Sequence, residues 1–196
     1  MKNQNESIGL FFGSFNPIHI AHLIIAQYIK QLYNLNKIWF IVSPQSPHKS
    51  DKSLISQFQR YYMVNIAVED THYFHASDIE FKLPKPSYTI NTINKLKEIY
   101  PDKKFSILMG QDNINSINTW KNYIDIVNNY TIYVFPRNNP TNKTLQINSP
   151  NIILTPTPLI DISSSLIRNL IKKNIDVSYM LHPKVYKYIQ EMNLYK

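Results

Sequence analysis

The sequence of 196 residues contains no cysteine. Disulfide bonds and metal sites built from thiolates are therefore excluded. Long apolar runs are also missing, and none approaches the roughly 18 residues that a membrane-spanning helix needs. The first residues, MKNQNES, lack the apolar core of a secretory signal peptide. We therefore expect a cytoplasmic protein with no membrane partner.

Glycine-rich nucleotide-binding loops of the common kinds are missing as well. The turn at Gly13-Ser14 has neither P-loop nor GxGxxG spacing, which argues against a kinase-type NTPase and a dehydrogenase. Acidic residues are outnumbered, and the net charge of +8 indicates anionic partners. Because the lysines are scattered rather than gathered in a block, they favour small phosphorylated substrates over nucleic acid.

The strongest signal that is present lies near the start of the chain. The apolar run Ile8 to Phe12 has the length and composition of a buried strand, and an amphipathic stretch opens at His19 after a short turn. Strand, turn and helix start form the first half of a nucleotide-binding βαβ unit, and free N–H groups at a helix start favour an anion. His19 and His22 lie on one helical face and can both point at that anion. A plain structural turn and a metal half-site are the alternatives, although no acidic third ligand is nearby.

Apolar runs alternate with amphipathic stretches along the rest of the chain. Strands are predicted at Ile8–Phe12, Lys37–Val42, Tyr73–Phe81, Phe105–Met109, Tyr130–Phe135 and Asn151–Thr155. Helices are predicted at His19–Leu32, Leu54–Val68 and Ile90–Tyr100, after Ser163, and from Pro183. This alternation predicts an α/β fold, a Rossmann-like parallel sheet with helices on both faces. With no linker or repeat, we expect a single domain, 1–196, with a C-terminal helical segment (about 163–196) packed on it.

Polar residues with phosphate-binding chemistry follow several of the predicted strands. Ser163 to Ser165 open a helix with hydroxyls and N–H groups, and Arg168 lies one turn later, where its fork can grip phosphate oxygens. A glycine and a carboxylate follow the fourth strand, at Gly110 and Asp112, where the backbone can approach a ligand and the carboxylate can accept from sugar hydroxyls. Lys49 lies in a loop at the carboxyl end of the second strand and can reach a phosphate; the alternative is an exposed lysine.

The motifs themselves resemble a known family. The stretch GSFNPIHIAH resembles the signature of the nucleotidyltransferase superfamily, with Phe12 and Ala21 as departures from its glycines. ISSSLIR, residues 162–168, matches the superfamily's C-terminal motif. Three further features resemble bacterial nicotinate-nucleotide adenylyltransferases: the loop SPHK, residues 46–49, the motif PSYT, residues 86–89, and Trp120 ten residues after Gly110. The resemblance covers nearly the whole chain, and it implies the nucleotidyltransferase variant of the fold.

The resemblance also implies roles for individual residues. The catalytic group would be His19, His22, Lys49 and Arg168. The ATP- and phosphate-binding group would be Gly13, Ser14, Phe15, Gly110, Asp112, Ile162, Ser163 and Ser164. The nicotinate-nucleotide pocket would be Ser87, Tyr88, Thr89 and Trp120. No metal ligands are expected from side chains, because Mg²⁺ would arrive with ATP and be held mainly by phosphates and water.

The implied reaction joins ATP and nicotinate mononucleotide into deamido-NAD, with release of pyrophosphate, in NAD biosynthesis. One alternative is a related enzyme that acts on nicotinamide mononucleotide or phosphopantetheine. A remote alternative is a basic nucleotide- or RNA-binding module without catalysis. Of the remaining arginines, Arg60 is interpreted as structural, tying its helix to the neighbouring loop, and Arg137 is retained from the family although the turn after it is altered. The sequence is compatible with a homo-oligomer.

Overall fold

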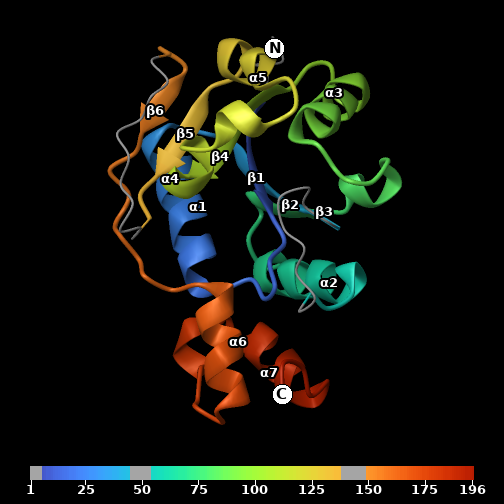
Figure 1. The fold of residues 1–196 in the computed structure, drawn as a ribbon, viewed down its shortest axis with the longest axis vertical. Helices are drawn as coiled ribbons and strands as arrows, with labels where there is room; N and C mark the ends of the chain where they lie inside the picture. Colours follow the sequence, from blue (N-terminus) through green and yellow to red (C-terminus); the bar gives the residue numbers. More distant parts are fainter. Residues whose placement is uncertain (1–5, 45–53, 138–148) are drawn as a thin grey trace.

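The computed structural model describes residues 6–44, 54–137 and 149–196. Its sheet has six parallel strands in the order β3-β2-β1-β4-β5-β6. The strands are β1 (Ser7–Gly13), β2 (Lys37–Val42), β3 (Phe74–Ser77), β4 (Lys104–Gly110), β5 (Ile132–Phe135) and β6 (Ile152–Leu154). The predicted Rossmann-like parallel sheet is confirmed (Figure 1).

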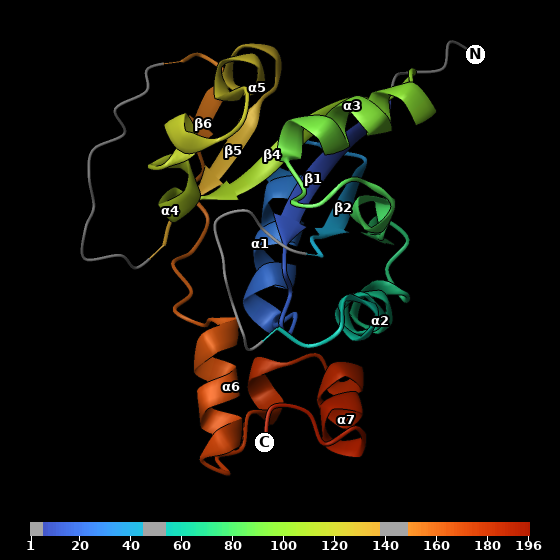
Figure 2. The same ribbon diagram turned by 45° about the vertical axis from the view of Figure 1, so that its right-hand side comes forward.

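Helices cover both faces of this sheet (Figures 1 and 2). They are α1 (Ile20–Leu32), α2 (Gln57–Val68), α3 (Thr89–Ile99), α4 (Gln111–Ile114), α5 (Tyr123–Asn129), α6 (Ser164–Lys172) and α7 (Pro183–Glu191). Three short 3₁₀ turns are η1 (Ile79–Lys82), η2 (Ile117–Thr119) and η3 (Ser178–Met180). None of the helices in the described ranges is both long and apolar enough to cross a membrane.

The strands place alternate residues in two separate cores, as a sheet covered on both faces requires. On β1, Phe11 packs with α1, α2, α6 and α7, whereas Ile8 and Leu10 pack with α3 and α5. Leu10 lies between Trp39 of β2 and Ile107 of β4, in the middle of the sheet. The central strands are therefore buried on both sides, which explains why they are nearly continuous apolar runs.

One predicted strand is wrong in its second half. Strand β3 ends at Ser77, and the backbone then turns into η1 instead of continuing to Phe81. The Ser77 hydroxyl accepts from the backbone N–H of Ile79, and the Phe81 N–H donates to the Asp78 carbonyl, so local bonds replace the sheet ladder. Other boundaries shift by a few residues: α2 starts at Gln57 because Ser56 caps it, its hydroxyl accepting from Phe58 N–H at 3.3 Å.

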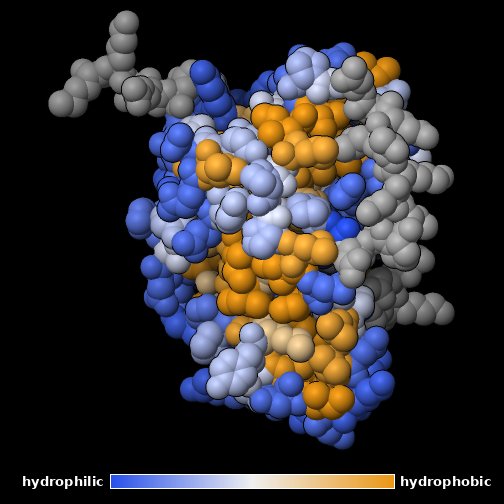
Figure 3. Space-filling view, turned by 90° about the vertical axis from the view of Figure 1, so that its left-hand side faces the viewer, coloured by the Kyte–Doolittle hydropathy of each residue, from blue (hydrophilic) through white to orange (hydrophobic). Residues whose placement is uncertain are grey.

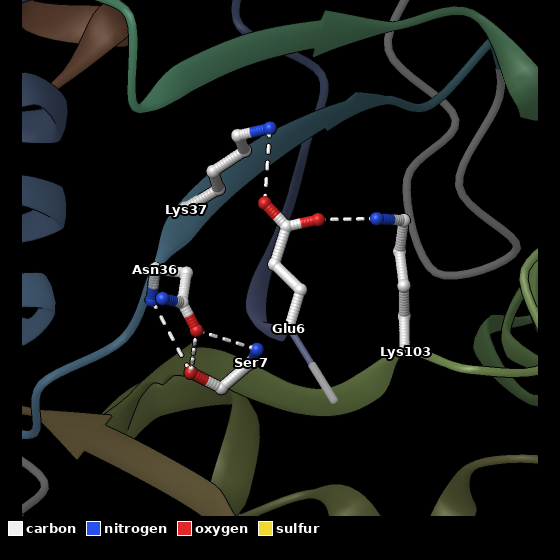
Figure 4. Close-up of polar contacts among 5 residues, drawn as sticks. All are labelled: Glu6, Ser7, Asn36, Lys37 and Lys103. Atoms are coloured by element: carbon white, nitrogen blue, oxygen red, sulfur yellow. Dashed lines mark hydrogen bonds and ion pairs between the residues drawn. The ribbon is translucent and has the colours of Figure 1, made fainter. Parts of the chain in front are cut away.

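Polar contacts fix the amino ends of the strands, at the edge where β1, β2 and β4 begin (Figure 4). The Glu6 carboxylate forms an ion pair with Lys37 at 2.9 Å and a second one with Lys103. These two lysines, Lys103 foremost, lower the pKa of Glu6. Beside them Ser7 donates from its N–H and its hydroxyl to Asn36 Oδ1, each at 2.8 Å. These contacts therefore lie at the end of the sheet opposite to the carboxyl ends of its strands.

The C-terminal helices α6 and α7 lie together at one end of the molecule, beyond the N-terminal end of α1 and beside α2 (Figures 1 and 2). Ile167 of α6 and Val185 of α7 are fully buried in the same core as α1 and α2. The division into one domain with this segment packed on it stays a prediction, as does the homo-oligomer.

The view from the side of β6 shows extensive apolar surface (Figure 3). Helix α1 also exposes apolar side chains, around an open hollow of about 620 Å³.

Candidate active site

A cavity of about 260 Å³ lies at the carboxyl ends of β1, β4 and β5. After β1 the chain builds the sheet in one direction through β2 and β3, and from β4 onward it builds in the other. Ligands of open α/β sheets bind at such a switch point. Most of the predicted phosphate-binding and catalytic residues line this cavity: Gly13, Ser14, Phe15, His19, His22, Gly110, Asp112, Ser163, Ser164 and Arg168.

The turn after β1 is shaped by Phe15. Its φ of 46° is left-handed, which a bulky residue adopts only when its surroundings hold it there. The Phe15 ring is buried and packs edge-on against the rings of Phe11 and His22, with centroids 5.8 and 5.1 Å apart. A Cβ atom on Gly13 would lie 2.8 Å from this ring. Glycine at position 13 therefore allows the ring to fold back under the turn and support His22.

The two histidines form one unit at the start of α1. His19 is the N-cap, and its backbone N–H donates to Nδ1 of His22 at 3.3 Å. The two rings stack with centroids 3.7 Å apart. Because Nδ1 of His22 accepts a hydrogen bond, the proton of the neutral ring is on Nε2. His22 therefore offers an N–H donor at Nε2.

His19 is held in its neutral form. Burial, with a smaller contribution from the charge of Arg137, lowers the pKa of His19 to about 3. Its Nδ1 is buried and has no hydrogen-bond partner among the described residues. At neutral pH the site therefore has its positive charge on arginine and not on His19.

This burial predicts an acid-sensitive fold. Since the pKa of His19 is about 6.5 when unfolded and about 3 when folded, the unfolded chain takes up a proton first as the pH falls. The stability that neutral His19 contributes is fully present above pH 6.5 and is lost between about pH 6.5 and 3. Between pH 8 and pH 5 this group alone lowers the free energy of unfolding by roughly 2 kcal/mol. Urea unfolding of the wild type and of His19→Asn at both pH values measures it.

The matched control is His72→Asn, which changes an exposed histidine. We expect the difference in the free energy of unfolding between pH 8 and pH 5 to be the same in His72→Asn as in the wild type, and smaller by roughly 2 kcal/mol in His19→Asn. An equal difference in all three proteins would contradict the burial of a neutral His19.

The start of α6 is fastened to the turn after β1. The Ser163 hydroxyl accepts from Leu166 N–H at 3.1 Å and caps the helix, and Ser164 Oγ donates to the Pro17 carbonyl at 2.8 Å. Arg168 donates from Nη1 to the Asn16 carbonyl at 2.8 Å and from Nη2 to Ser165 Oγ at 3.2 Å. A helix N-terminus, its hydroxyls and a guanidinium thus face the cavity together, an arrangement suited to an anion.

The opposite wall comes from the ends of β4 and β5. A Cβ atom on Gly110 would collide with Oδ1 of Asp112, so glycine is what lets this carboxylate fold back over the strand end. Asn113 and Arg137 also line the cavity, although no role was predicted for Asn113 and only a retained arginine was predicted at 137. The Arg137 guanidinium lies 5.4 Å from the Phe135 ring centroid, and its Nε is buried with no hydrogen-bond partner in the described part of the chain.

Arg60 bonds to the turn after β1 and to the loop after β2, which confirms the prediction that it ties its helix to a neighbouring loop. Its side chain is almost fully buried. The guanidinium donates to the carbonyls of Ser14 (2.6 Å), Ser43 (2.7 Å) and Pro44 (2.9 Å), and Nε donates to the Ile55 carbonyl (3.2 Å). One side chain thus joins the loops after β1 and β2 to the start of α2.

The residues predicted for the nicotinate pocket do not line this cavity. Ser87, Tyr88 and Thr89 lead into α3, with Tyr88 as its N-cap. Tyr88 and Trp120 pack against the same core cluster, and Lys121 Nζ lies 4.9 Å from the Tyr88 ring centroid. The two segments, distant in sequence, therefore lie side by side, as a shared pocket requires. Ile162 packs against the other core, and Lys49 lies outside the described residues.

Beside the residues predicted for the nicotinate pocket (the second region, Ser87–Thr89 with Trp120 and Lys121) lies a buried acid that the sequence analysis did not predict. Glu80 in η1 is 2% exposed, and Thr92 of α3 donates to its Oε1 at 2.8 Å. Burial raises the pKa of Glu80, and the nearby hydroxyls of Thr92, Ser43 and Ser87 offset part of that rise. The strand predicted through Phe81 gave no reason to expect a carboxyl group packed against α3.

Metal ligands do not cluster in the part of the chain that is described. No three His, Cys, Asp or Glu side chains there form a group that could hold a metal ion. Asp112 is the acidic residue among those that line the cavity.

Known proteins are similar to this chain in sequence and in fold. Residues 10–170 match the cytidylyltransferase-like family. A probable nicotinate-nucleotide adenylyltransferase of Flavobacterium psychrophilum is 46% identical over 96% of this chain and 98% of its own length. One of Caldicellulosiruptor saccharolyticus is 39% identical over 96% of this chain and 98% of its own length.

Solved structures agree with the architecture. The nicotinic acid mononucleotide adenylyltransferase of Plasmodium falciparum complexed with NaAD superposes with a TM-score of 0.74 at 23% identity, over 97% of this chain and 98% of that one. This likeness supports the fold, and the closer relatives and the family match support membership. The chain thus belongs to the cytidylyltransferase-like family and, within it, to the group of the nicotinate-nucleotide adenylyltransferases.

Proposed function

We propose that this protein transfers the adenylyl group of ATP to nicotinate mononucleotide, forming deamido-NAD and pyrophosphate. The observation that carries the proposal is the cavity itself, because the His19–His22 pair and the start of α6 with Arg168 line it together at the end of β1. Full-length relatives named for this activity support it.

The proposed reaction needs charge stabilisation more than a base. The attacking group is the phosphate of the mononucleotide, which is substantially ionised at neutral pH because its second pKa is about 6. It attacks the α-phosphorus of ATP, the bond from that phosphorus to the bridging oxygen breaks, and pyrophosphate leaves with the electron pair. The chain must bring two anions together and bind the negative charge that develops.

The geometry suits each residue to one part of this task. His22, with its proton on Nε2, donates to the α-phosphate as charge builds, and neutral His19 holds His22 in that orientation through its N–H. The N-terminus of α6, Ser163, Ser164 and Arg168 bind the β- and γ-phosphates. Arg137 adds positive charge at the opposite wall. Mg²⁺ enters with ATP as part of the substrate, held by phosphates and water.

The second region supplies the choice of acceptor. Tyr88 and Trp120 offer aromatic surface for a pyridine ring, and the start of α3 offers N–H groups and hydroxyls to a carboxylate. Lys121 over the Tyr88 ring adds a positive charge that favours nicotinate over the uncharged amide.

Pyrophosphate release tests the proposal directly. With ATP and Mg²⁺, nicotinate mononucleotide, nicotinamide mononucleotide and phosphopantetheine are compared as acceptors. We expect kcat/KM for nicotinate mononucleotide to exceed the others by at least roughly tenfold, because a buried site built for one polar group leaves its partners unpaired with another. Preference for another acceptor would contradict the assignment of the nicotinate pocket but not that of the phosphate site. No turnover with any of them would favour a nucleic-acid-binding module, recognised by its steep salt dependence.

A further inference from the structure

The end of the chain reaches back to the turn in front of α1. After α7, Asn193 takes a left-handed φ of 54°, and Leu194 N–H bonds back to the Ile189 carbonyl at 3.0 Å. This reversal ends the helix and buries Leu194. The next residue, Tyr195, is thereby directed back toward the β1–α1 turn.

Tyr195 makes one polar contact with that turn. Its hydroxyl donates to Oδ1 of Asn16 at 2.9 Å. Asn16 is 1% exposed and lines the cavity. The backbone carbonyl of the same asparagine accepts from Arg168, and the next carbonyl, of Pro17, accepts from Ser164. The C-terminal segment therefore holds two consecutive residues of the turn at three points.

The conformation of Tyr195 shows that these contacts hold it in place. Its φ of 67° is left-handed, which costs a bulky residue on the order of 1–2 kcal/mol. Its ring packs against the core that α1 and α2 share. Burial raises the pKa of Tyr195, so its hydroxyl stays protonated at neutral pH and can donate.

We propose that Tyr195 is a positioning residue for the phosphate site: its hydroxyl fixes Asn16, and thereby holds the turn from Ser14 to Pro17 in the conformation that binds the triphosphate of ATP. The role deepens the proposed function and depends on ATP as the ligand. It acts through Asn16, without contact between Tyr195 and substrate.

The test removes the hydroxyl alone. Tyr195→Phe keeps the ring and should fold, and Tyr179→Phe, at a position 96% exposed in η3, is the matched control. We expect Tyr195→Phe to lower kcat/KM for ATP by roughly three- to tenfold, the value of one hydrogen bond. The KM for the mononucleotide and all constants of the control should stay within roughly twofold of wild type.

A double-mutant cycle with Asn16→Ala separates positioning from general support of the fold. If Tyr195 acts through Asn16, adding Tyr195→Phe to Asn16→Ala causes no further loss in kcat/KM for ATP. The same loss in both backgrounds, or a loss that the unfolded fraction accounts for, would overturn the proposal.

The proposed function can fail separately. Should the wild type use none of the acceptors, binding of a non-hydrolysable ATP analogue, measured by calorimetry, replaces turnover in the same cycle. Weaker binding of the analogue by Tyr195→Phe, absent in the Asn16→Ala background, would support the positioning role even then. Equal binding by wild type and Tyr195→Phe would exclude it.

Discussion

His22→Ala should lower kcat by roughly 10²- to 10³-fold, because loss of one preorganised donor to a developing oxyanion costs about that much. The KM for ATP should change far less, since Arg168 and the start of α6 still bind the triphosphate in the ground state. Steady-state pyrophosphate release, with each substrate varied in turn, measures both constants. Because Nδ1 of His22 accepts from the His19 N–H, Nε2 is the nitrogen that can donate to the substrate. We expect this donor to act on the charge that develops during the reaction, so its loss should lower kcat more than it raises KM.

Two further variants locate the effect at Nε2. In His22→Gln the side-chain amide can place a donor near the position of Nε2, so part of kcat should return. His72→Ala, at an exposed histidine, should leave both constants at the wild-type value. Turnover of His22→Ala close to that of wild type would remove His22 from the catalytic group.

Sequence patterns predicted the sheet well because its strands are buried on both faces. Such strands are short apolar runs bounded by turn residues, and Lys37–Val42 is found where the sequence places it. The same rule fails after Ser77, where Ile79 and Phe81 continue an apolar alternation although the backbone has left the sheet. In η1 the buried side chain is Glu80, which lies between the half-buried Ile79 and Phe81. The apolar alternation therefore predicted neither the end of the strand nor the residue that is buried.

The candidate site was predictable only in its local parts. Motifs at strand ends identified His19, His22 and Arg168, since each motif carries its own chemistry within a few residues. The contacts of Asn16 with Arg168 and with Tyr195 join residues from opposite ends of the chain. They depend on how α6 and α7 pack beyond the start of α1, and no local pattern encodes that packing. Motifs therefore predicted residues that line the cavity, whereas the contacts that hold the turn after β1 depend on tertiary structure.

Arg60→Met should be the most destabilising single substitution proposed for this chain, although it leaves every substrate-facing residue in place. The methionine fills much of the volume but donates no hydrogen bond to the carbonyls of Ser14, Ser43 and Pro44. We expect the free energy of unfolding to fall by roughly 3–5 kcal/mol, because each buried carbonyl left unpaired costs about 1–3 kcal/mol and relaxation recovers part of it. Urea unfolding at neutral pH measures this change.

The controls for Arg60→Met separate hydrogen bonding from charge. Lys82→Met removes an exposed positive charge and should change the free energy of unfolding by less than about 0.5 kcal/mol. Arg60→Lys keeps the charge, but a single ammonium cannot reach carbonyls on both loops and before α2 at once, so it should recover only part of the loss. If Arg60→Met were as stable as Lys82→Met, the buried guanidinium would not be what joins these loops. The expected result instead makes Arg60 the connection through which the fold sets the turn at Ser14, so the folded fraction of Arg60→Met should also show a raised KM for ATP.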